Sequence, residues 1–309
     1  MIATVTFNPA VDHTIQIGAM PDPETVTRAD AAKFDAGGKG INVAQYLVRL
    51  DAETVATGFL GEFTGDYIRQ ELNADGIHAD FVKIDDQTRI NTTILDSETE
   101  YKINQTGPTV DEAAVDDVID IIYDHEPAMV LVGGSLPPGL DYRAIDRIAE
   151  AGSWETSVDV GGKVLAQLGS NYALCKPNRD ELSSATNTDV SSLDECIAAA
   201  NQLRSTGFDR VVTSLGSDGA LVVDENKTLH AAALDVEVVD TAGAGDGMLS
   251  GFLLELSHGN GVRAGLRHGI AVAAQVVSVP GTRIPSFDTL DESISRVEIT
   301  DYAATSGRL

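Results

Sequence analysis

The sequence predicts an α/β protein in which a parallel sheet is covered by helices. Two observations carry this prediction: short apolar runs alternate with helix-patterned runs along most of the chain, and glycine-rich turns follow several of the apolar runs. Strands that alternate with helices form parallel sheets, because each crossover between parallel neighbours needs a helix. At 309 residues and 43% hydrophobic composition, the chain is long enough to bury a large core.

The expected elements follow from residue spacing. Short apolar runs predict strands at 2–7, 54–59, 129–132, 156–160, 172–174, 210–213, 220–223 and 236–239. Apolar residues three and four apart predict helices at 40–50, 64–74, 111–123, 141–151, 192–205 and 248–256. We expect Thr64 to cap the second helix and Gly76 to end it.

Two segments, 12–34 and 81–106, alternate polar and apolar residues without a helical pattern. Within the second, residues 89–96 and 100–104 flank a Ser-Glu-Thr turn and read as a hairpin. A few such strands are not stable alone, so we expect a small sheet against the main body or a partner subunit. The polar tail, 286–309, is expected at the periphery.

The charge of the chain is extreme, with 48 Asp and Glu against 21 Lys and Arg, a formal net charge of -27. So acidic a surface repels phosphate polyanions and anionic lipids, which argues against nucleic-acid and membrane partners. The acidity is spread along the chain, which suits a salt-accumulating cytoplasm where ions screen self-repulsion. An ordinary acidic protein is the alternative, and full stability after refolding at low salt would favour it.

The remaining composition predicts a cytoplasmic protein. Cys175 and Cys196 lack metal-ligand spacing, so we expect free thiols in a reducing compartment. The N-terminus has neither the basic start nor the apolar run of a signal peptide. No stretch approaches the roughly 18 apolar residues of a membrane span.

The strongest chemical signal is the glycine-rich stretch 240–247, Asp-Thr-Ala-Gly-Ala-Gly-Asp-Gly, which opens a helix. Glycines at a helix start let successive backbone N–H groups converge on one anion, aided by the positive end of the helix dipole. Asp246 then lies in the first turn, where it could take a proton from an attacking hydroxyl. The alternative is a simple turn with Asp246 as an N-terminal helix acid.

Four further motifs each have a structural alternative. Residues 37–42, Gly-Gly-Lys-Gly-Ile-Asn, would suit a sugar or a phosphate, or form a flexible turn. Residues 212–219 could admit a nucleotide, or be only a hairpin. Asn178 and Glu181 could hold hydrated Mg²⁺, or simply start a helix. The loop 133–139 ends a strand, where open α/β sheets bind ligands. Together the motifs describe phosphoryl transfer to an alcohol.

With these motifs, the chain resembles the ribokinase-like, or PfkB, carbohydrate kinases over nearly its whole length. The resemblance lies in the ordered pair of motifs 37–42 and 240–246, about 200 residues apart. Residues 8–12, Asn-Pro-Ala-Val-Asp, and the loop Gly-Ser-Leu-Pro-Pro-Gly resemble the phosphosugar branch, above all the enzymes acting on fructose 1-phosphate. The resemblance implies one three-layer α/β/α kinase domain, 1–309, with a small β-sheet lid from about 12–34 and 81–106.

It also implies the site residues. The catalytic group would be Asp246 as base, with an anion hole of Gly243, Ala244 and Gly245. The substrate group would be Asp12, Gly38, Lys39, Asn42, Arg89 and Ser135, with Arg28 assisting from a partner subunit. The nucleotide group would be Lys176, Asn178, Ser214, Gly216 and Gly219. Glu181, with Asn178, would hold Mg²⁺ through water.

The resemblance implies ATP-dependent phosphorylation of fructose 1-phosphate at its 6-hydroxyl, in a homodimer joined by the lid strands. Tagatose 6-phosphate and fructose 6-phosphate remain alternative acceptors, and ADP an alternative donor. Residues 271–281 resemble an adenine wall and a monovalent-cation loop, so K⁺ is compatible. A non-catalytic sugar-phosphate binder is the rival from another class. A dinucleotide-dependent oxidoreductase fits less well, because its glycine fingerprint belongs after the first strand.

Overall fold

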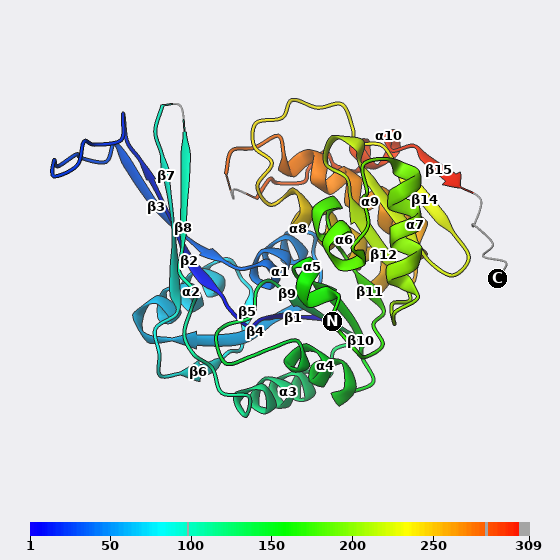
Figure 1. Ribbon diagram of the computed structural model, residues 1–309, viewed down its shortest axis with the longest axis horizontal. Coiled ribbons are helices and arrows are strands. Elements are labelled where there is room, and N and C mark those ends of the chain that lie inside the picture. The colour runs from blue at the N-terminus through cyan, green and yellow to red at the C-terminus, as the bar shows by residue number, and fades with distance from the viewer. Residues whose placement is uncertain (98, 282–283, 303–309) are drawn as a thin grey trace.

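A computed structural model of the chain describes residues 1–97, 99–281 and 284–302. Its body is built on an eleven-stranded central sheet in the order β15-β14-β13-β12-β11-β10-β9-β1-β4-β5, with β6 also paired to β4 (Figure 1). The strands of this sheet are β1 (Ile2–Thr6), β4 (Thr54–Gly61), β5 (His78–Ala79), β6 (Val82–Ile84), β9 (Met129–Gly133), β10 (Glu155–Asp159), β11 (Leu174–Cys175), β12 (Val211–Ser214), β13 (Ala220–Val223), β14 (Thr228–Ala231) and β15 (Ile299–Tyr302). The strands from β12 to β5 along this order run parallel, and β13, β14 and β15 add an antiparallel edge.

The helices cover both faces of this sheet, as the sequence predicts. They are α1 (Lys39–Arg49), α2 (Glu62–Ala74), α3 (Ala114–His125), α4 (Arg143–Ala151), α5 (Gly162–Leu165), α6 (Arg179–Thr186), α7 (Leu193–Arg204), α8 (Ala244–Ser257), α9 (Gly261–Val276) and α10 (Leu290–Arg296). Alternate residues of β9 show why two layers are needed: Val130 and Val132 pack with the α3, α4 and α7 side, whereas Met129 and Leu131 pack with α1, α8 and α9. A strand buried on both faces needs a helix layer on each.

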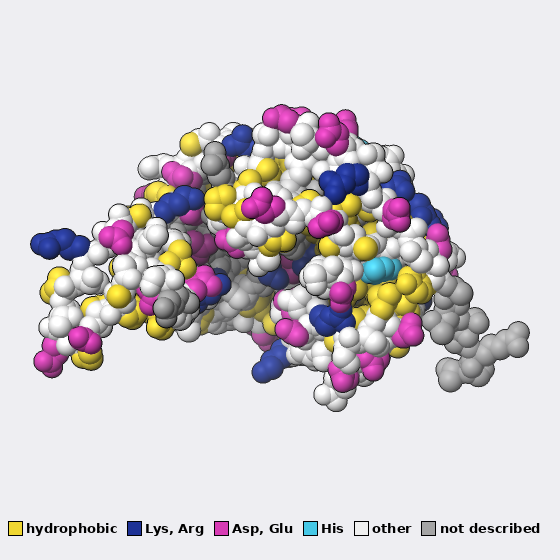
Figure 2. Space-filling view, turned by 90° about the horizontal axis from the view of Figure 1, so that it is seen from above, with side chains coloured by type: hydrophobic (Ala, Val, Ile, Leu, Met, Phe, Trp, Pro, Cys, Tyr) yellow, Lys and Arg dark blue, Asp and Glu magenta, His cyan; other side chains and the backbone are white. Residues whose placement is uncertain are grey.

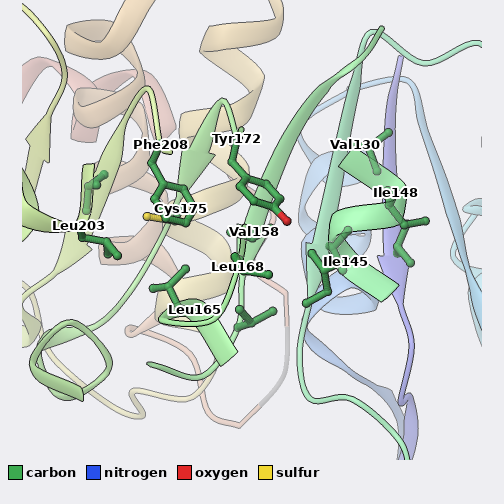
Figure 3. Packing of buried hydrophobic residues seen from close by; sticks show 14 of the residues in the cluster. Val130, Ile145, Ile148, Val158, Leu165, Leu168, Tyr172, Cys175, Leu203 and Phe208 are labelled. Atoms are coloured by element: carbon green, nitrogen blue, oxygen red, sulfur yellow. The ribbon is translucent and has the colours of Figure 1, made fainter. Parts of the chain in front are cut away.

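Aromatic and aliphatic side chains fill the first of these layers. Tyr172 stacks on Phe208 with ring centroids 5.3 Å apart, and Cys175 and Leu165 lie beside them (Figure 3). Cys175 and Cys196 are both buried free thiols, as expected. Among the residues that the structure describes, none of the helices combines the length and the apolar character of a membrane span.

A second, four-stranded sheet projects from the body as an arm, in the order β3-β2-β7-β8 (Figure 1). Its strands are β2 (Ala10–Gln16), β3 (Ala31–Gly37), β7 (Arg89–Leu95) and β8 (Glu100–Asn104). They come from the two segments that lacked a helical pattern, and β7 with β8 is the expected hairpin. The predicted fold class, a mostly parallel sheet between helices with a small separate sheet, is confirmed.

Three local predictions were wrong. Thr64 does not cap α2, whose N-cap is Gly61; its hydroxyl instead donates to the Thr88 carbonyl and ties the helix to the chain before β7. Residues 236–239 form no strand: Val238 and Val239 are 60% and 52% exposed, and a strand this apolar needs a sheet to cover it. The tail is not wholly peripheral, because β15 pairs with β14; residues 303–309 of the predicted tail lie outside the described residues.

Candidate active site

The site lies where the parallel strands end. Asn8 follows β1, Ser135 follows β9, Asp159 ends β10 and Lys176 follows β11. Because parallel strands point the same way, their carboxyl ends meet at one edge of the sheet. Seen from above, the molecule is hollowed between the arm and the body, with basic and acidic side chains around the hollow (Figure 2).

Asp246 lies in the first turn of α8, directly after the glycine turn. Gly243 is the N-cap of this helix, with φ of 76°, a left-handed conformation that glycine adopts without strain. Asn42 of α1 donates from Nδ2 to Asp246 Oδ2 at 2.8 Å, which joins the two glycine motifs across 204 residues of sequence. The structure therefore brings the predicted base to the predicted sugar-binding motif.

The surroundings of Asp246 raise its pKa, so its carboxyl group is a weaker acid than that of an ordinary aspartate. Burial raises the pKa of Asp246 to about 6, and the negative charge of Asp159 adds to the rise. The hydrogen bond from Asn42 and the charges of Lys176 and Lys39 partly offset it. Asp246 as a residue nevertheless keeps part of its surface exposed. A carboxylate with a pKa of about 6 is ionised near neutrality, yet more basic than an ordinary aspartate, which suits a general base.

Asp159 is the hub of a buried ion network. Its side chain has no exposed surface; Oδ1 lies 2.6 Å from Lys39 Nζ, and Oδ2 lies 3.3 Å from Lys176 Nζ in an ion pair without hydrogen-bond geometry. Lys39 also lies 3.5 Å from Glu181 Oε1. Burial by itself lowers the pKa of Lys39, but the carboxylates of Asp159 and Glu181 outweigh it and raise that pKa. Lys39 therefore stays charged.

A cavity of about 380 Å³ on the arm side contains most of the predicted substrate residues. Its lining includes Gly38, Lys39, Asn42, Arg89, Ser135 and Glu181, with Asn8 and Gly134. The guanidinium of Arg89 donates to the carbonyls of Asn8 and Gln105 and to Ser135 Oγ. Arg89 is thus fixed over the loop 133–139 rather than free in solvent.

Asp12 lies beside this cavity on the arm. Asn91, its partner in the β2–β7 register, donates from Nδ2 to Asp12 Oδ1 at 3.0 Å. Burial raises the pKa of Asp12, opposed by the Asn91 hydrogen bond and by Arg89. Arg28 lies elsewhere: it is exposed in the loop between β2 and β3, beyond the Gln16–Ala31 pair at the far end of the strands, and lines neither this cavity nor the next.

A second cavity, about 660 Å³, adjoins the glycine turn and contains the predicted nucleotide residues Asn178, Ser214, Gly216 and Gly219 with Ala244 and Gly245. A volume of several hundred Å³ is typical of cofactor sites. One wall is apolar, formed by Ile270, Ala273, Ala274 and Val277 of α9 and its end. Lys176 reaches the glycine turn: a Cβ added to Gly245 would be 3.5 Å from Lys176 Nζ.

The stretch 178–181 is an ordinary helix start as well as a candidate metal site. Asn178 Oδ1 accepts from the Glu181 N–H, and Glu181 Oε2 accepts from the Asn178 N–H, a complete capping box. Glu181 Oε1 remains outside the box and faces Lys39. No cluster of three or more His, Cys, Asp and Glu suited to a metal occurs among the described residues. Glu181 Oε1 is the carboxylate oxygen of Glu181 that the capping box leaves over, so a Mg²⁺ here would be held mainly through water.

Sequence reasoning missed three polar residues that the structure places in the site. Asn8 follows the predicted strand 2–7, and Asp159 lies near the end of the predicted strand 156–160, so the strand-end rule could have found them. Asn91 carries no such signal, because its place beside Asp12 depends on strand register. The predicted monovalent-cation loop is described only to Gly281, whose N–H donates to Asp240 Oδ2 at 3.0 Å; Thr282 and Arg283 lie outside the described residues.

Comparisons with known proteins agree with this geometry. A family model described as pfkB family carbohydrate kinase matches residues 5–290. The chain is 49% identical over 97% of its length, and 98% of the relative's, to a 1-phosphofructokinase of Haloferax volcanii. It is 35% identical over 97% of its length, and 99% of the relative's, to a D-tagatose-1-phosphate kinase of Bacillus licheniformis. The crystal structure of Escherichia coli phosphofructokinase-2 in complex with potassium superposes with a TM-score of 0.88, at 28% identity over 95% of this chain and 98% of that one.

Proposed function

The chain belongs to the pfkB family of carbohydrate kinases, and from this premise we propose that it transfers the γ-phosphate of ATP to the 6-hydroxyl of fructose 1-phosphate. The products are fructose 1,6-bisphosphate and ADP. The observation that carries the proposal is the position of Asp246 between the two cavities. It accepts a hydrogen bond from Asn42, which lines the cavity of about 380 Å³, and it directly follows Gly245, which lines the cavity of about 660 Å³. The 49% identity to a 1-phosphofructokinase supports the choice of acceptor.

In the proposed reaction the 6-hydroxyl oxygen attacks the γ-phosphorus and its proton passes to Asp246. The bond between the γ-phosphorus and the β,γ-bridging oxygen breaks, which releases ADP. The N–H groups of Ala244 and Gly245, at the positive end of α8, would stabilise the charge of the transferring group. Lys176 beside Gly245 would add a buried positive charge.

The substrate residues would divide the acceptor between them. Asp12 and Asn42 would bind sugar hydroxyls, Gly38 would allow the sugar to approach the backbone, and Arg89 with Ser135 would bind the existing phosphate. Mg²⁺ bound near Asn178 and Glu181 would neutralise the phosphates of ATP. Ser214, Gly216 and Gly219 would border the nucleoside against the apolar wall of α9.

A coupled ADP-release assay tests the proposal. Fructose 1-phosphate, fructose 6-phosphate, tagatose 6-phosphate and tagatose 1-phosphate are compared at saturating MgATP, with ADP as a second donor, and in KCl or NaCl. We propose that the acidic surface is an adaptation to a salt-rich cytoplasm, so the panel includes molar KCl. We expect the highest kcat/KM with fructose 1-phosphate and ATP. A preference for another phosphosugar would reassign the acceptor, and binding without turnover would indicate the non-catalytic alternative.

Activity should depend on the ionisation of Asp246. Its pKa is raised to about 6, so the protonated, inactive form dominates below that pH and the base is available above it. We expect kcat/KM to be level above about pH 7 and to fall tenfold per unit well below pH 6. Measurement from pH 5 to 8 at constant ionic strength checks this. The substrate phosphate titrates near the same pH, so the fall at low pH is assigned by comparison with Asp159→Asn, which changes the surroundings of Asp246 but not the phosphate.

We propose that two copies pair through the small four-stranded sheet, by the face opposite to the one that carries Asp12 and Asn91. By strand register, Phe34, Ile94, Tyr101 and Ile103 share one face, and Ile103 is 60% exposed. Apolar patches of this kind mark protein contacts. A partner there could also supply Arg28, which lies outside the site of its own chain.

Ile103→Lys should disrupt this dimer. In sedimentation velocity we expect the parent protein at twice its chain mass of 32.5 kDa and the variant mainly at the single-chain mass. The matched control is Phe63→Lys, which places the same charge at a residue 67% exposed on α2, outside the small sheet. A parent protein that sediments as a monomer, or a variant that stays dimeric, would refute the proposed interface.

A further inference from the structure

Tyr46 is a buried residue of α1 that the proposed reaction leaves without a role. It lies one helical turn after Asn42, so both side chains face the start of α8. Only 3% of its surface is exposed. Its ring packs with Val272, Val276 and Phe287, and the Phe287 ring centroid lies 6.5 Å away. The ring is therefore held firmly, and its hydroxyl has a fixed position.

That hydroxyl lies directly against the glycine turn that opens α8, whose backbone N–H groups at Ala244 and Gly245 are here called the anion cradle. A Cβ added to Gly243 would be 2.5 Å from Tyr46 Oη, well inside contact distance. Gly243 is the N-cap of α8, and the N–H groups that follow it are those proposed to bind the transferring phosphoryl group. The hydroxyl thus occupies the space behind the cradle.

The hydroxyl also stays neutral. Burial raises the pKa of Tyr46, and the charge of Asp246 raises it further. No negative charge therefore develops behind the cradle in the working pH range. A neutral, immobile group suits a cradle that must bind anionic oxygens.

We infer that Tyr46 is a positioning residue for phosphoryl transfer, whose hydroxyl holds the Gly243 turn so that the cradle N–H groups point at the transferring phosphoryl group. Charge on that group is greatest in the transition state, where misplaced donors lose most of their effect. Loss of the hydroxyl should then lower kcat while leaving ground-state binding almost intact. The inference rests on the proposed function, because kinase turnover is its readout.

Tyr46→Phe tests the inference, since it keeps the ring and removes the hydroxyl. We expect kcat to fall by about tenfold, with KM for ATP and for the sugar phosphate within about twofold of the parent values. The matched control is Tyr172→Phe, which removes a buried hydroxyl that donates to Asp146 outside the site. The control should lower Tm without changing kcat.

A double-mutant cycle with Gly243→Ala adds a second readout. In the parent background the new methyl group collides with Tyr46 Oη, and alanine is also strained at the positive φ of residue 243. In the Tyr46→Phe background the hydroxyl is gone, so only the backbone strain remains. We therefore expect a several-fold smaller loss of kcat from Gly243→Ala in the second background. An unchanged kcat in Tyr46→Phe, a loss confined to Tm, or losses that simply multiply would overturn the inference. An inactive parent protein would instead refute the proposed function.

Discussion

Asp246→Asn should lower kcat by about a thousandfold, with little change in KM for either substrate. The amide keeps an oxygen for the Asn42 hydrogen bond but accepts no proton from the sugar hydroxyl. Both cavities keep their lining, so binding should persist. Steady-state kinetics at pH 7.5 with fructose 1-phosphate and MgATP measure the effect.

Stability gives a second test of the same substitution. A raised pKa means that burial disfavours the carboxylate, so Asp246 lowers the stability of the folded state progressively as the pH rises from 3.8, the ordinary aspartate pKa, to about 6, and the full loss persists at higher pH. Asp246→Asn should therefore unfold at a Tm no lower than the parent's at pH 7.5. Asp235→Asn, on the exposed loop before α8, controls for the loss of one negative charge. Turnover within tenfold of the parent value would exclude Asp246 as the base.

The sequence predicts the body of the fold well, because local pattern and burial agree there. The apolar run 129–132 and the helical spacing in 40–50 each specify an element that the core then buries. The failure at 236–239 has the opposite cause: a strand-like run lies over the surface, since the Val239 N–H bonds to Val277 of the α9 end instead of a sheet partner. Apolar composition alone does not supply that partner.

Site residues are predictable from the sequence where a glycine motif determines the local backbone conformation. They are less predictable where strand register or helix packing determines which side chains meet. The glycine turns fix the positions of Asp246 and Asn42 on two helices, and the hydrogen bond between them follows from the packing of α1 on α8. Asn91 and Tyr46 enter the site through strand register and helix packing, which leave no local mark. Arg28 illustrates the limit: its charge suits a phosphate, but its loop lies beyond the far end of the β2–β3 pair.

Asp159→Asn should be the most destabilising change in the site. Asp159 has no exposed side-chain surface and lies between Lys39 and Lys176, the latter 4% exposed. Removing one partner of a buried ion pair leaves uncompensated charge and costs about 3–5 kcal/mol. We expect a lower Tm, and kcat reduced by about a hundredfold because both lysines lose their anchor.

The same variant should change the pH profile in a direction that a merely unstable protein would not show. The charge of Asp159 raises the pKa of Asp246, so its removal should move the acid limb of kcat/KM below pH 6. The phosphate of the substrate titrates unchanged, which separates the two origins of the limb. Asp116→Asn is the matched control: it breaks the exposed pair with Arg147, for which we expect at most about 1 kcal/mol and no change in the profile. If Asp159→Asn loses stability while the limb stays in place, Asp159 anchors the lysines without tuning the base.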